Sequence, residues 1–293
     1  MKVVKILSVM LAGLIVAGFG DDSGDLDRYD IPYQGEKKLI IDLDFAFGSL
    51  NIRPSDNEDY IMRAGMTYIK ESLKPSLEYE VKGNKGKLQL GTKDNDHNFS
   101  LKEFNRMKEA NNENEWRLEF IKSIPSSYSI DFGAGDGNMD FSGMAINDMD
   151  FELAMGDVEL FFDEPNQIKM KEMSVETGLG SFEARGLGNA NISNFTLECG
   201  LGSSYLVFNG EFIGVMRADI SVGLGSVDIE LPENVEVEIR SNSSFLSSTD
   251  FDNFDKVGSG LYRSENWGSD AIDAKIIIDL SVGMGSANVS WID

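Results

Sequence analysis

Seven segments of the chain share a glycine that is followed by serine or aspartate and that has the same small and apolar neighbours. Two residues before each of these glycines stands another glycine or an alanine. Self-similarity of this kind is the signature of a repeat architecture, so it constrains the fold more than composition does. The repeat glycines are Gly48, Gly135, Gly156, Gly180, Gly202, Gly225 and Gly285.

Each copy alternates apolar and polar residues up to the glycine. Apolar or small residues stand one, three and five positions before it, as in Ile220, Val222 and Leu224. This period of two predicts a strand with one buried face. After the glycine the apolar positions are two and four residues on, as in Val227 and Ile229, so the alternation slips by one. Because a slip turns the buried face outward unless the chain bends, the pattern predicts two short strands that meet at a glycine corner.

The spacing of the copies predicts how they stack. From Gly135 to Gly225, successive repeat glycines are 21, 24, 22 and 23 residues apart. Further apolar residues lie ten and twelve positions before the glycines, which predicts a third inward strand in each unit. These residues are Ile146, Met170, Ile192 and Val215 at ten, and Met144, Ile168, Ala190 and Ile213 at twelve. Three short strands in about 22 residues suit one coil of a parallel β-helix, and parallel crossovers are right-handed by default.

We therefore expect an all-β chain that forms a right-handed parallel β-helix, or solenoid, of about 22-residue coils with β-rich end regions. An antiparallel sandwich or barrel also has short alternating strands and is the alternative. We expect a signal peptide over residues 1–20 and a flexible acidic linker over 21–36. An N-terminal β region over 37–126, with a short helical insert near 101–109, precedes the central solenoid repeats over 127–231. Residues 232–293 form a C-terminal β coil and cap with an acidic, Ser-rich loop.

The N-terminus and the charge bear on location and partners. Lys2 and Lys5 precede an apolar run over 6–19, which is typical of a signal peptide and too short for a bilayer span. We expect export to the periplasm, the cell surface or the medium, with no integral membrane span in the mature chain. The 50 acidic and 26 basic residues leave a formal charge of −24, which argues against nucleic acid and anionic membranes as partners.

Few side chains suit catalysis or metal binding. The single cysteine, Cys199, falls at an inward position, and the single histidine, His97, cannot build a zinc site alone. Four residues before the glycines, stacked coils would align acidic side chains about 5 Å apart. Such a ladder needs solvent, protonation or cations, and Ca²⁺ is the candidate cation; a solvated acidic face is the alternative. The ladder residues are Asp131, Glu152, Glu176 and Glu198.

Several segments resemble a known family. Residues 37–54, 116–125, 130–136 and 155–158 resemble the bacterial toast-rack domain. Residues 232–240 and 277–291 are similar to the C-terminal region of LiaF-type cell-envelope stress proteins and to adhesin-like head domains. The resemblance implies an extracytoplasmic β-helical module and supplies no catalytic residues, and this chain lacks the multi-helix membrane region of the LiaF type.

These observations favour a non-enzymatic extracytoplasmic β-solenoid module that binds or supports an unidentified component of the cell envelope or surface. We expect no catalytic residues and no cofactor besides the candidate Ca²⁺. One alternative is an accessory protein of the envelope stress response. A second is a glycan-active β-helix enzyme, for which the central repeats supply few basic residues to neutralise acidic polymers: Lys169, Lys171, Arg185 and Arg217.

Overall fold

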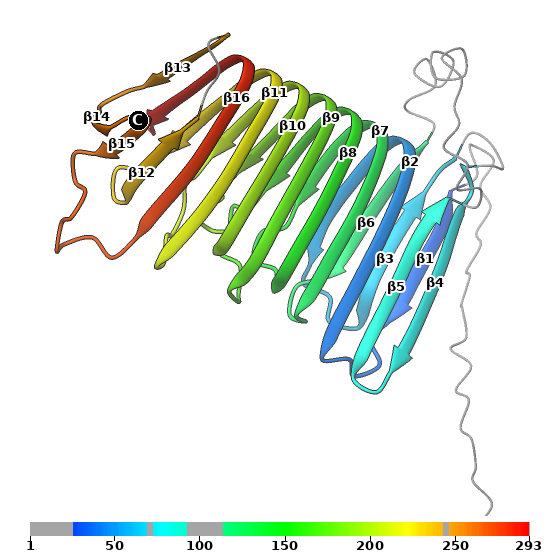
Figure 1. The fold of residues 1–293 in the computed structure, drawn as a ribbon. Helices are drawn as coiled ribbons and strands as arrows, with labels where there is room; N and C mark the ends of the chain where they lie inside the picture. The colour runs from blue at the N-terminus through cyan, green and yellow to red at the C-terminus, as the bar shows by residue number, and fades with distance from the viewer. Residues whose placement is uncertain (1–25, 69–72, 93–113, 243–245, 293) are drawn as a thin grey trace, which may run out of the picture.

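The computed structural model describes residues 26–68, 73–92, 114–242 and 246–292, and these ranges form strands and loops without a helical element. Figure 1 shows the strands side by side along one long axis. The sixteen strands of the sheet are β1 (Asp27–Pro32), β2 (Lys38–Ser55), β3 (Tyr60–Met66), β4 (Pro75–Lys82), β5 (Lys85–Thr92), β6 (Glu115–Ile121), β7 (Ser126–Asp140), β8 (Ile146–Phe161), β9 (Met170–Arg185), β10 (Ile192–Val207), β11 (Val215–Leu231), β12 (Glu236–Ser241), β13 (Ser247–Phe251), β14 (Phe254–Gly258), β15 (Leu261–Ser264) and β16 (Lys275–Trp291).

The seven strands that carry the repeat glycines lie next to one another in the order β2-β7-β8-β9-β10-β11-β16, and every neighbouring pair is parallel. The parallel pairing excludes the antiparallel alternative for this part of the sheet. The glycines pair with one another in register, Gly135 with Gly156 and Gly156 with Gly180, for example. Each strand continues through its glycine and bends there, so the two predicted short strands are the two legs of one long strand (Figure 1).

The backbones at the corner approach so closely that only glycine fits. At Gly180 the φ angle is +137°, and a Cβ atom would lie 1.8 Å from the carbonyl oxygen of Gly156. Two residues earlier, a Cβ on Gly178 would lie 2.5 Å from the carbonyl oxygen of Ala154. Both small-residue rows of the repeat therefore follow from the contact between neighbouring coils.

The core fills the inside of the bend. Residues three and five before the glycines and four after them are buried, which confirms the inward positions expected there. Cys199 belongs to this buried set, as expected. In the first coils the rings of Phe45 and Phe132 stack with their centroids 5.2 Å apart, and Trp116 packs edge-on against Phe45 at 4.9 Å. These aromatic contacts continue the core into the N-terminal strands.

Buried asparagines hold the loops between the long strands. The amide nitrogen of Asn166 donates to the carbonyl oxygens of Ile146 (2.9 Å) and Ile168 (2.8 Å), and its oxygen accepts from the N–H of Ile146 (2.7 Å). Asn189 in the next loop donates to the carbonyl oxygen of Phe162 (2.9 Å). These side chains satisfy backbone groups where the loops leave the strand ladder.

One inward prediction is wrong in most copies. A second, the third inward strand, is right for the buried residues Ile146, Met170 and Ile192 but wrong in its extent. The position immediately before the glycine is exposed in the five copies from Met155 onward, as at Leu224, because the pairing skips the residue before it and the bend starts there. The predicted third strand is also not a separate element, because Met170 and its equivalents begin the long strands. Within that stripe Val215 and Ile213 are exposed, since Met216 takes the inward place at the start of β11.

The predicted linker and the end regions also need correction. Residues 27–32 form β1, because Ile31 is buried and the strand pairs antiparallel with β3. The acidic, Ser-rich segment of the C-terminal region contributes β13, which pairs with β16, and part of the β14–β15 hairpin. The predicted signal peptide and the helical insert near 101–109 lie outside the described residues.

Candidate functional site

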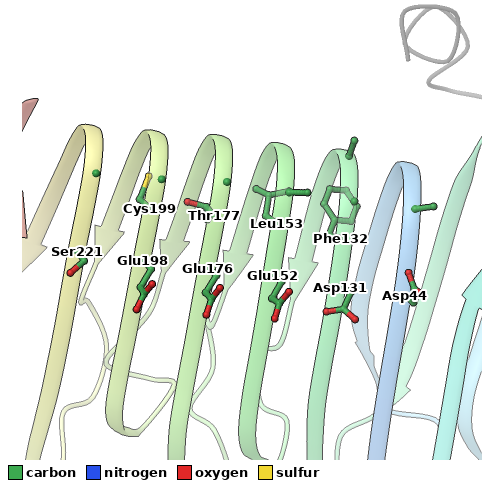
Figure 2. Close-up of a pocket in the computed structure, with 17 residues that line it drawn as sticks. Asp44, Asp131, Phe132, Glu152, Leu153, Glu176, Thr177, Glu198, Cys199 and Ser221 are labelled. Atoms are coloured by element: carbon green, nitrogen blue, oxygen red, sulfur yellow. The ribbon is translucent and has the colours of Figure 1, made fainter. Parts of the chain in front are cut away.

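A groove of about 800 Å³ runs across the strands on the outer side of the bend. Its lining comes from equivalent positions on β2, β7, β8, β9, β10 and β11. Each strand contributes one acidic or hydroxyl side chain and one small residue, and β7 to β10 also contribute the residue between these two. Figure 2 shows the labelled side chains of this groove. Because every rung contributes the same set, the groove is a product of the repeat.

The acidic wall of the groove contains the four candidate cation ligands. The register pairs Asp131 with Glu152, Glu152 with Glu176, and Glu176 with Glu198. Asp44 on β2 extends the row, and Ser221 on β11 ends it (Figure 2). Neighbouring rungs of a sheet are about 4.8 Å apart, so these carboxylates stand in a line with like-charged neighbours.

The electrostatic cost of this line of carboxylates falls on its first glutamate, Glu152. The neighbouring carboxylate of Asp131, followed by burial and by Glu176, raises the pKa of Glu152 above its ordinary value. Repulsion between like charges favours the neutral, protonated form of a carboxyl group. The row therefore favours a positively charged partner that relieves this repulsion.

The floor of the groove consists of the small residues two before the repeat glycines. Their side chains are absent or reduced to a methyl group because the carbonyl oxygens of the preceding coil leave no room, as at Gly200, where a Cβ would lie 2.9 Å from the oxygen of Gly178. Larger side chains at these places would also fill the groove. The small residues that the close contact between coils requires therefore leave a continuous channel beside the carboxylates. The floor residues are Ala46, Gly133, Ala154, Gly178, Gly200 and Gly223.

A row of exposed aliphatic side chains follows the floor, one residue further along each strand. We call it the aliphatic ridge; its members are between 36% and 48% exposed, and each immediately precedes a repeat glycine. The sequence pattern assigned these positions to the core, because alternation alone does not locate the start of the bend. The ridge consists of Met155, Leu179, Leu201, Leu224 and Met284.

The chain itself covers the first two rungs of this row. Phe47 and Ala134 occupy the position that the ridge residues occupy in later coils. Phe47 and the floor residue Ala46 are buried in a small cluster with Leu73, against which Tyr68 and Ala134 also pack. Beyond Ala134 the row is exposed.

In the described ranges, no group of three or more His, Cys, Asp or Glu side chains is arranged to hold a metal ion. The carboxylate row lies along one wall, so calcium binding stays a prediction. In the same ranges no helix has the length and apolar character of a membrane span. His97 lies outside the described residues.

One known family matches more than half of the chain. The family described as the N-terminal domain of toast_rack, DUF2154, matches residues 20–185. A crystal structure of a candidate cell adhesion protein from Clostridium sporogenes is similar at 20% identity, with a TM-score of 0.46, over 92% of this chain and 100% of that one. A candidate adhesin from Bacteroides fragilis is similar at 14% identity, with a TM-score of 0.39, over 92% and 98%. No curated protein matches the sequence.

Proposed function

We propose that this chain, which belongs to the toast-rack N-terminal domain family, is a non-enzymatic β-solenoid module that binds a component of the cell envelope or surface. The observation that carries the proposal is the groove with its parallel rows of carboxylates and aliphatic side chains. Rows repeated at a fixed spacing on a hydrogen-bonded sheet form an extended binding surface, which is how repeat proteins engage their partners.

The winding of the coils is part of the proposal. The paired repeat glycines advance along the chain from 135 to 156, 180, 202 and 225, which supports coils of about 22 residues. Right-handed winding follows from the general preference of parallel crossovers. In this arrangement every coil adds one rung to the groove.

The placement of the carboxylates favours binding over glycan cleavage. Glycosidases place two carboxyl groups on either side of the scissile bond, where one donates a proton and the other attacks or activates water. Here Asp131, Glu152 and their neighbours stand in one row on one wall (Figure 2). Such a row provides a negative potential along the groove, which suits recognition of a positively charged partner.

Export is a second part of the proposal, supported by the signal-peptide pattern of residues 1–20. Cell fractionation with mass spectrometry of the mature N-terminus tests it. We expect a chain that begins near residue 21 in the envelope or extracellular fraction. A chain that begins at Met1 and stays in the cytosol would contradict export.

The binding proposal is tested by sedimentation of the purified protein with isolated envelopes of the cells that produce it. The variant Ala154→Gln places a longer, uncharged side chain on the groove floor and should reduce the sedimented fraction severalfold. Ser259→Gln, in the exposed turn between β14 and β15, is the matched control and should behave as wild type. Equal sedimentation of all three proteins would exclude the groove as the binding surface.

A further inference from the structure

The aliphatic ridge is continuous across five neighbouring strands. Its members belong to β8, β9, β10, β11 and β16, which follow one another in the sheet. At about 4.8 Å per rung the ridge extends about 19 Å. A contiguous exposed apolar strip with polar surroundings marks an interaction site on a soluble protein.

Acidic side chains flank the ridge on both sides. On one side lies the carboxylate row, which includes Glu152, Glu176 and Glu198. On the other side, past the repeat glycines, the chain presents further carboxylates on the outer face of the second leg. These are Asp136, Asp157, Glu159, Glu183 and Asp228. Arg185 forms an ion pair with Glu183 at this border, but acids outnumber bases on both flanks.

The contact that the chain makes with its own first rungs shows what chemistry fits. Leu73 and Tyr68 pack on Phe47 and Ala134, at the start of the same row. The ammonium group of Lys74 lies 5.7 Å from the centroid of the Tyr68 ring. The first rungs are therefore covered by apolar side chains with a cationic side chain beside them, and the ridge continues the same surface with its side chains exposed.

The negative charge of the chain favours a positively charged partner on the exposed ridge. The net charge of −24 repels a second copy of the chain, a nucleic acid and an anionic membrane. An amphipathic helix with an apolar stripe between two rows of Lys or Arg matches the ridge and both acidic flanks. A length of about 19 Å corresponds to about 13 helical residues.

We infer that the aliphatic ridge, with its acidic flanks, is a docking face for a cationic amphipathic peptide segment. This inference rests on the proposed binding function and names the chemistry of its partner. Apolar contacts with Leu179, Leu201 and Leu224 hold the peptide, and the flanking carboxylates select its charge and orientation.

The test measures binding of a fluorescent 14-residue peptide of Leu and Lys, with all leucines on one helical face, by anisotropy. A second peptide has the same composition in an order that spreads the leucines around the helix. A third carries Glu in place of Lys. We expect the amphipathic cationic peptide to bind about tenfold more tightly than its isomer, since only it buries a full apolar stripe. We expect the Glu peptide not to bind.

Four variants separate the ridge from general charge attraction. Leu179→Ser combined with Leu201→Ser should weaken binding about tenfold, because it removes two apolar contacts. Ile213→Ser removes an even more exposed apolar side chain away from the ridge and should leave affinity unchanged. Glu176→Gln combined with Glu198→Gln should weaken binding and reduce its salt dependence. Glu172→Gln on the same face of β9 is its control. Circular dichroism confirms that each variant is folded.

Equal affinity of the two cationic isomers, or unchanged affinity of the ridge variant, would overturn the inference and leave only general attraction to an acidic surface. Absence of peptide binding would also overturn it. If Ala154→Gln still lowers envelope sedimentation in that case, the proposed binding function stands with a different partner. If both experiments fail, both proposals fall.

Discussion

The substitution Gly180→Ala tests the corner that holds the coils together. At this position φ is +137°, and the added Cβ would lie 1.8 Å from the carbonyl oxygen of Gly156, a backbone atom of the neighbouring strand. Placing an alanine in this backbone region costs about 2 kcal/mol. Separating the two coils enough to admit the methyl group costs about another 2 kcal/mol. We expect a loss of about 4 kcal/mol in the free energy of unfolding.

A matched control isolates the steric part of this loss. At Gly35 the φ angle is +99°, and an added Cβ would meet no atom within 4 Å. Gly35→Ala should therefore cost about 2 kcal/mol or less, from backbone strain alone. Urea denaturation followed by far-ultraviolet circular dichroism gives both values. If the two variants differ by less than about 1 kcal/mol, the close approach of the corner backbones does not explain the glycine repeat.

Three further outcomes follow from individual side chains. Neighbouring carboxylates raise the pKa of Glu152, so its destabilising repulsion grows as pH rises from the unfolded to the folded pKa. Glu152→Gln should therefore gain about 0.5 kcal/mol of stability at neutral pH. Thermal scans should show this gain vanish below the unfolded pKa of a glutamate, about 4.3. Asn166→Ala breaks three hydrogen bonds from a buried side chain to backbone groups and should cost about 3 kcal/mol in urea denaturation. Replacing the exposed Asn194 with alanine should cost less than about 0.5 kcal/mol, as at a surface site. The ammonium of Lys275, 2.8 Å away, lowers the pKa of the buried Glu236 carboxyl. The stability that this ion pair gives the fold is therefore present above the unfolded pKa and lost as pH falls through the folded pKa. Glu236→Gln should lose less thermal stability than wild type on acidification, and an equal loss would contradict this role.

The sequence could predict the corner because backbone contact dictates it. A glycine whose Cβ would strike a neighbouring carbonyl recurs in every coil, and so do the buried positions on either leg, such as Ile220 and Ile229. Parallel stacking in register then places Glu152 beside Asp131 and Glu176. These features depend on local geometry and on the repeat, both of which are visible in one sequence.

The ridge could not be predicted in the same way. Leu224 continues the apolar alternation of Ile220 and Val222, so its pattern is that of a core residue. Only the pairing shows that the bend begins before the glycine and leaves this side chain outside. The role of Asn166 also could not be predicted from the sequence. A polar residue in a loop does not indicate which buried backbone groups its side chain will bind.

Binding at the ridge is tested most directly by nuclear magnetic resonance of the protein labelled on its methionine methyl groups. Met155 and Met284 lie at the two ends of the ridge, whereas Met170, Met173 and Met216 are buried in the core. On addition of the amphipathic cationic peptide, we expect large shifts of the Met155 and Met284 methyl resonances and small shifts of the three core methyls. Shifts confined to other methyls, or saturation of the peptide without a change at Met155 and Met284, would contradict binding at the ridge.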